Sequence, residues 1–120
     1  MEPSHVLGMI AGYYLSRCDE RAYQSLGFES KTATHIELAR AFGTKPASVR
    51  NWRDEFGPVH DNPRRGWDKR EMTPSRVRVV EALGDVSDDE LLQLLRAAIV
   101  SPSGVAACRL VDLVGPADTI

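Results

Sequence analysis

The side chains that most often bind metals or attack substrates are few and widely spaced in this sequence. Its cysteines are Cys18 and Cys108, and its histidines are His5, His35 and His60. No cysteine has a second Cys or a His at the spacing of a metal site. We therefore expect two buried or half-buried thiols, three histidines without a special role, and no bound metal.

An acidic cluster is the other place where catalytic chemistry would be sought. Asp88, Asp89 and Glu90 follow Ser87 at the start of an apolar-periodic run, and this pattern predicts a helix N-terminus instead of an acid–base site. The chain contains no G-x-S-x-G, no glycine-rich phosphate loop and no H-E-x-x-H. We expect neither an enzyme nor a cofactor.

Basic side chains, by contrast, gather in the middle of the chain. Between residues 31 and 80 there are eleven Lys and Arg against six Asp and Glu, whereas the remainder carries four against eleven. The net charge of -2 conceals this asymmetry. Because a polyanion is attracted to a locally basic surface, the asymmetry indicates where one would dock.

The length and composition are those of one domain, residues 1–120. The chain has 120 residues, of which 42% are apolar, enough for a modest core. No apolar run approaches the ~20 residues of a membrane span. Glu2 precedes the first apolar residues, unlike the basic start of a signal peptide, so we expect a cytoplasmic protein.

Apolar periodicity and capping residues predict an all-α, compact multi-helix fold. In the first helix the apolar positions lie mostly on one face: Val6, Met9, Ile10, Tyr13 and Leu15. The expected helix starts are Ser4, Asp19, Ser30 or Thr32, Pro46, Thr73 and Ser87, and a last helix is expected over Val105–Val114. The C-terminal helices together cover residues 74–114.

The longest irregular segment is GPVHDNPRRGWDKREM, residues 57–72. Loops of this length in compact domains are usually functional or disordered. Its basic side chains are Arg64, Arg65, Lys69 and Arg70. The loop forms either a short wing-like hairpin or an extended arm, and Trp67 either anchors it to the core or contacts a nucleic acid.

The stretch ELARAFGTKPASVRNW, residues 37–52, places a glycine between two helix-like runs. Ala39 is small where a second helix would cross, and Gly43, four residues later, suits a tight left-handed turn. Val49 and Trp52, three residues apart, would then point back into the core. Residues 34–56 resemble the helix-turn-helix of DNA-binding regulators; a purely structural helical hairpin is the alternative.

The solvent face of the second helix carries the side chains that such a motif needs. Arg makes bidentate contacts to guanine, and Asn does the same to adenine, in the major groove. Asp54 and Glu55 either orient the arginines or face away. The residues expected to contact DNA are Thr44, Lys45, Ala47, Ser48, Arg50, Asn51 and Arg53, with Arg64, Arg65, Lys69 and Arg70 of the loop.

These features predict a sequence-specific double-stranded DNA-binding protein, with the loop on the flanking backbone as in winged helix-turn-helix proteins. Small regulators of this type generally bind as dimers. The helices Asp88–Val100 and Val105–Val114 supply either that dimer contact or intramolecular core. The alternative function is a helical protein–protein adapter, which gives no reason for a basic segment around the turn.

A second resemblance covers Gly12 to about Leu95. The succession of YYLSRCDERAYQSLGF, RDEFGP, NPRRGW and SRVRVVEALGDVSDDEL resembles a helical module at the N-termini of some bacterial restriction and phage-defence proteins. The resemblance implies a DNA-targeting module, isolated or stand-alone, whose activity comes from an effector domain or a protein partner. No catalytic residue carries over from it.

Overall fold

Helices account for all the regular structure in residues 3–60 and 73–115, the parts of the chain that the computed structural model describes. No strand occurs in these two ranges, so the all-α prediction is confirmed there. The elements are α1 (Pro3–Cys18), α2 (Glu20–Leu26), α3 (Lys31–Phe42), α4 (Pro46–Phe56), the 3-10 helix η1 (Gly57–His60), α5 (Pro74–Leu83), α6 (Asp88–Val100) and α7 (Val105–Val114). None of the described helices combines the length and the apolar character that crossing a membrane requires.

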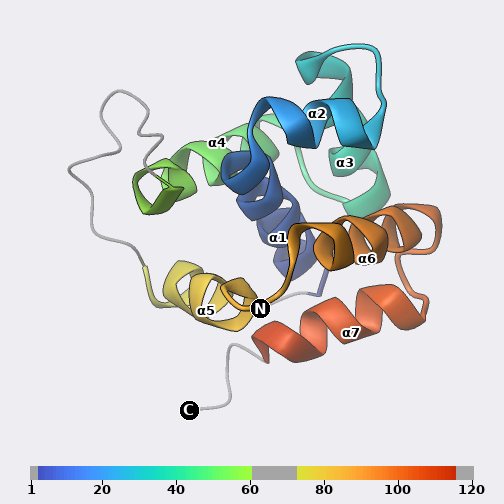
Figure 1. Ribbon diagram of the computed structural model, residues 1–120. Coiled ribbons are helices and arrows are strands. Elements are labelled where there is room, and N and C mark those ends of the chain that lie inside the picture. Colours follow the sequence, from blue (N-terminus) through green and yellow to red (C-terminus); the bar gives the residue numbers. More distant parts are fainter. Residues whose placement is uncertain (1–2, 61–72, 116–120) are drawn as a thin grey trace.

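α1 lies in the middle of the molecule, with the other helices arranged around it (Figure 1). Every residue from Val6 to Ser16 is buried, which corrects the one-faced amphipathic helix predicted from the sequence. The residues between the expected apolar positions are small, such as Gly8 and Ala11, or aromatic, such as Tyr14, and these can be buried as well. A helix that is apolar all round is stable only when neighbours cover every side.

α1 and α4 pack together closely through two glycines one turn apart. A Cβ on Gly8 would lie 2.6 Å from Cζ3 of Trp52. A Cβ on Gly12 would lie 2.6 Å from Cβ of Trp52 and 3.0 Å from the backbone nitrogen of Arg53. Because no real side chain fits at these distances, the two glycines set how deeply α4 sits against the core.

Serine side chains cap two helices where the sequence predicts helix starts. Ser30 Oγ accepts a hydrogen bond from the Ala33 N–H at 3.0 Å, and Ser87 Oγ accepts one from the Glu90 N–H at 3.1 Å. Asp19 differs: it precedes α2 as expected, but with a φ of 48° its side chain makes no capping hydrogen bond. The predicted helix start is confirmed there, whereas the predicted side-chain cap is wrong.

The apolar faces of α6 and α7 turn toward α1 and each other. Leu91, Leu95 and Leu110 are fully buried, so these side chains are intramolecular core, one of the two roles expected of them. Val100 and Val105, at the corner between the two helices, are 86% and 79% exposed. The C-terminal helices therefore complete the core and leave a small apolar corner in solvent.

Candidate nucleic-acid interface

α3 and α4 meet at a tight turn centred on Gly43. This residue has φ 68° and ψ 32°, a left-handed conformation that favours glycine, and the N–H groups of Gly43 and Thr44 both point to the carbonyl of Ala39. Ala39, Val49 and Trp52 are at most 5% exposed. The glycine turn and the three inward positions agree with the sequence, and they determine which side of α4 points outward.

The outward side of α3 and α4 is basic. The exposed charged side chains on these two helices and their turn are Lys31, Arg40, Lys45 and Arg50. Of these, Lys31 pairs with Glu20 and Arg40 with Glu37. The acidic residues on the same elements, Glu37, Asp54 and Glu55, are all partly buried. Among the ion pairs formed between described residues, none involves Lys45 or Arg50. Within the described residues, these two side chains therefore have no anionic partner.

The acidic residues of α4 are held by neighbouring arginines. Asp54 Oδ1 lies 2.9 Å from Nη2 of Arg53. Glu55 Oε2 lies 2.7 Å from Nε of Arg76, which α5 supplies. Each of these carboxylates is less than a quarter exposed. Their pairing reduces the repulsion that they would otherwise exert on a polyanion at α4.

The residues expected to contact DNA divide by their exposure. Lys45, Ala47, Arg50 and Asn51 are exposed, and Ser48 is half-buried. Thr44 lies beneath the turn, where its Oγ1 is buried and has no hydrogen-bond partner among the described residues, so this hydroxyl does not reach the outer surface. Arg64, Arg65, Lys69 and Arg70, with Trp67, lie outside the described residues, and their roles stay predictions.

Arg53 points inward, unlike the outward or flanking position expected from the sequence. Its side chain is 13% exposed. Nη1 donates a hydrogen bond to the Tyr23 hydroxyl at 2.9 Å, and Nε donates to Asp54 Oδ1 at 3.0 Å. The Tyr23 hydroxyl in turn lies 2.7 Å from His35 Nε2. Arg53 thus joins α4 to α2 and α3 and does not stand beside Arg50 on the surface.

His35 is the member of this network to which sequence analysis gave no role. Burial, together with the nearby charges of Arg53 and Arg50, lowers its pKa to about 4, while Asp54 acts in the opposite direction. The imidazole is therefore neutral at pH 7. A signal was present in the sequence, because His35 precedes Leu38 and Phe42 at the three- and seven-residue spacings of one helix face.

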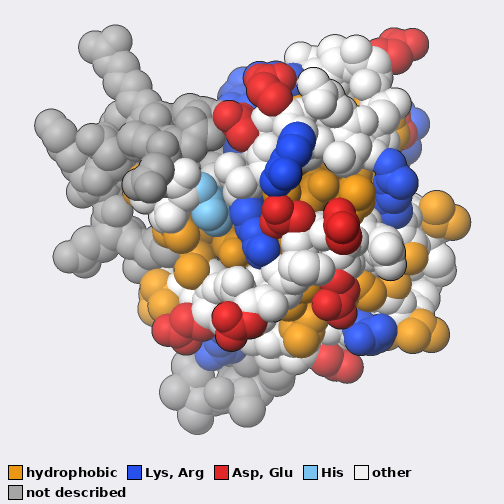
Figure 2. Space-filling model, viewed as in Figure 1, with side chains coloured by type: hydrophobic (Ala, Val, Ile, Leu, Met, Phe, Trp, Pro, Cys, Tyr) orange, Lys and Arg blue, Asp and Glu red, His pale blue; other side chains and the backbone are white. Residues whose placement is uncertain are grey.

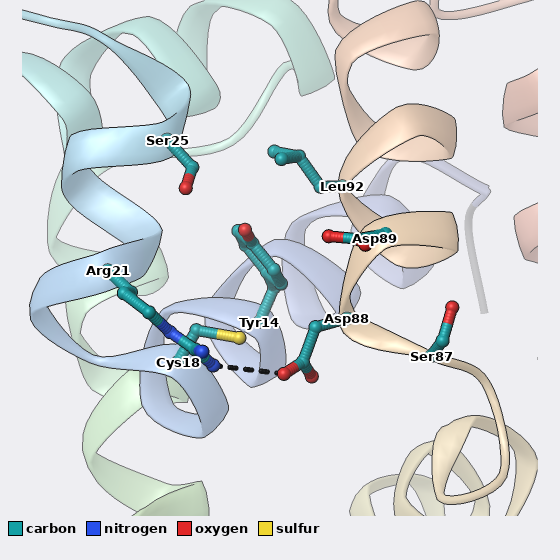
Figure 3. Close-up of a pocket in the computed structure, with 8 residues that line it drawn as sticks. All are labelled: Tyr14, Cys18, Arg21, Ser25, Ser87, Asp88, Asp89 and Leu92. Carbon is teal, nitrogen blue, oxygen red and sulfur yellow. Dashed lines mark hydrogen bonds and ion pairs between the residues drawn. The ribbon is translucent and has the colours of Figure 1, made fainter.

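A second polar region lies where α1 and α2 meet the start of α6. A cavity of about 370 Å³ opens there, lined by Tyr14, Cys18, Arg21, Ser25, Ser87, Asp88, Asp89 and Leu92 (Figure 3). Asp88 Oδ1 lies 2.8 Å from Arg17 Nε, and Asp88 Oδ2 lies 3.0 Å from Arg21 Nη2. Basic and acidic side chains lie next to one another on the surface between α2 and α6 (Figure 2).

Arg17 ties this junction to α5 as well. Its Nη1 donates to the carbonyl of Leu83 at 3.0 Å, and its Nη2 donates to the carbonyl of Val86 at 2.6 Å. These carbonyls belong to the end of α5 and the link to α6, and the Leu83 carbonyl also accepts the Val86 N–H at 3.1 Å. The charged groups around the cavity therefore hold four helices together.

The two cysteines differ in their surroundings. Cys18 is buried, and burial raises the pKa of its thiol, which keeps it protonated at neutral pH. Cys108 is exposed, which corrects the expectation that both thiols are at least half-buried. In residues 3–60 and 73–115, no group of three or more His, Cys, Asp or Glu side chains is arranged to hold a metal ion.

No protein-family model matches this chain, and no curated protein or solved structure matches it. A functional assignment therefore depends on the residues and the geometry of the chain itself.

Proposed function

We propose that this protein binds double-stranded DNA through α3 and α4, used as a helix-turn-helix. The observation that carries the proposal is the outward face of α4, where Lys45 and Arg50 are exposed and lack ion pairs with described residues. The left-handed turn at Gly43 supports it, because it allows the short connection that this motif uses.

In the proposed complex, α4 enters the major groove with its N-terminus first. Arg50 and Asn51 reach base edges, since Arg pairs with guanine and Asn with adenine. Lys45 stands at the start of α4, where no side chain caps the helix. The uncapped N–H groups and the positive end of the helix dipole add attraction for a DNA phosphate.

The basic loop extends the same proposal. Arg64, Arg65, Lys69 and Arg70 contact the flanking backbone, as a wing or as an extended arm. The protein acts as a regulator or as the DNA-targeting module of a restriction or defence system, with a homodimer on two half-sites as the expected arrangement. An effector domain or protein partner supplies any further activity.

The first experiment is fluorescence anisotropy on a random-sequence duplex over a series of salt concentrations. Release of counterions predicts a steep loss of affinity as the salt concentration rises.

Arg50→Ala should weaken binding to a selected specific site by about 1–3 kcal/mol. Arg21→Ala is the matched control, because it removes an exposed arginine from the α1–α2–α6 junction. Absence of binding at low salt by the folded protein contradicts the proposal.

A second candidate function is a helical protein–protein adapter. The apolar corner formed by Val100 and Val105 favours it, because large exposed apolar side chains often mark an interaction surface. In that case Val100→Lys should abolish a stable hetero-complex, and the folded protein should have no salt-dependent affinity for DNA. The two functions are therefore separated by the same anisotropy measurement.

A further inference from the structure

We propose that Tyr23 is a positioning residue for DNA binding: its hydroxyl holds Arg53 on Asp54, and this keeps the Asp54 carboxylate away from Arg50. The inference rests on the proposed function and deepens it. Tyr23 belongs to α2, is 7% exposed and has no place on the basic face. Its effect is exerted through two residues of α4.

The Tyr23 hydroxyl makes two hydrogen bonds with described residues, one to Arg53 and one to His35. The Arg53 guanidinium has no acceptor, so the Tyr23 oxygen accepts from Nη1 at 2.9 Å. The hydroxyl then donates its proton to His35 Nε2, 2.7 Å away. A neutral His35 accepts at Nε2, in agreement with its lowered pKa. Tyr23 thus joins an acceptor on α3 to a donor on α4.

Arg53 approaches Asp54 with two nitrogens while Tyr23 holds its third. Nε and Nη2 lie 3.0 and 2.9 Å from the same Asp54 oxygen, Oδ1. Both side chains are less than a fifth exposed, so the pair is fixed near the core. These two contacts orient the Asp54 carboxylate toward Arg53.

Arg50 is the residue that would compete for Asp54. The two are four residues apart on α4, a spacing that places their side chains on the same face, where opposite charges attract. If the Tyr23 hydroxyl is removed, Arg53 loses one of its three hydrogen bonds. Its pair with Asp54 is then held less firmly, and the carboxylate can turn toward Arg50 more often. An Arg50 paired with Asp54 binds DNA less well.

A double-mutant cycle tests the inference on the full chain, with anisotropy on a DNA duplex as the readout. Tyr23→Phe removes only the hydroxyl and should weaken DNA binding about 3- to 10-fold. In the Asp54→Asn background the same change should weaken binding by less than about 2-fold, because no carboxylate remains to capture Arg50. Tyr14→Phe is the matched control, since this buried tyrosine lines the cavity in Figure 3.

Each outcome of the cycle has a definite meaning. Circular dichroism melts establish that every variant is folded at the assay temperature. An equal loss of affinity in both backgrounds means that Tyr23 supports the fold alone, and the inference is then wrong. An unchanged affinity for Tyr23→Phe overturns it as well. Wild-type protein without salt-dependent binding overturns the proposed function, and this inference fails with it.

Discussion

The outward face of α3 and α4 and the junction of α1, α2 and α6 use the same residue type differently. At the junction, Arg17 and Arg21 share the carboxylate of Asp88, and Arg17 also binds backbone carbonyls. On the outward face, Lys45 and Arg50 are exposed and form no ion pair with a described residue. The carboxylate at the junction neutralises two arginines, whereas Lys45 and Arg50 on the outward face have no described residue that neutralises them.

The comparison shows that an arginine's role follows from its partners. Arg53 and Arg50 stand one turn apart on α4, yet Arg53 is bound by Asp54 and Tyr23, while Arg50 is exposed. Paired arginines cross-link helices, whereas an unpaired one on a basic surface attracts anions. Four measurements test this division, from the largest expected effect to the smallest.

The largest expected effect is a loss of folding stability in acid, through His35 in the contact of α2, α3 and α4. The pKa of His35 is about 4 in the folded protein and about 6.5 in an unfolded chain. The unfolded state therefore takes up a proton first, and stability falls as the pH drops from about 6.5 to 4, by up to about 3 kcal/mol. Burial, Arg53, Arg50 and Lys31 act in this direction, and Asp54 opposes them.

Urea titrations at pH 7 and pH 4.5 measure this loss in the free energy of unfolding. His35→Gln is the matched variant, because its amide oxygen accepts a hydrogen bond from Tyr23 and takes up no proton. It should lose less stability than wild type over this range. His60, whose pKa is also lowered, remains in both proteins and cancels in the difference. Equal losses would assign the acid sensitivity to other groups.

Gly12→Ala should disturb the packing of α1 against α4, the helix on which Arg50 lies. The new methyl would lie 2.6 Å from Trp52 Cβ, so α4 or α1 must shift. We expect about 2 kcal/mol less stability, although alanine favours a helix by about 1 kcal/mol over glycine. Thermal denaturation measures the change. A rise in melting temperature would mean that the contact between α1 and α4 accommodates a methyl group without strain.

Asp88→Asn should act on the junction alone. Loss of the carboxylate leaves Arg17, whose side chain is 19% exposed, without its charged partner. We expect a destabilisation of about 1–2 kcal/mol. Affinity for DNA at a temperature where the variant is folded should stay the same. A change in affinity there would show that the two regions are coupled.

Arg21→Ala should have the smallest effect. This side chain is 70% exposed, and Asp88 keeps its second partner, Arg17. Exposed ion pairs contribute little to stability because water screens them. The melting temperature and the affinity for DNA should both stay within error of wild type. A loss of affinity would place the junction in the DNA-binding surface and remove the contrast between the two regions.

Much of the local structure was readable from the sequence. Ser30 and Ser87 cap helices by short-range hydrogen bonds, and Gly43 adopts the left-handed turn, because these preferences depend on residues a few positions away. The inward positions Val49 and Trp52 followed from helical periodicity. Which side of α4 faces solvent was therefore predictable.

Long-range contacts decided the rest. The sequence places Arg50 and Arg53 equally well on the surface, but Tyr23, thirty residues away from Arg53, turns one of them inward. Asp88 is read as a helix N-terminus, and it is also the shared partner of two arginines from α1 and α2. Periodicity specifies the face of a helix, whereas the partner of a charged side chain depends on which distant helix the packing of α1 brings beside it.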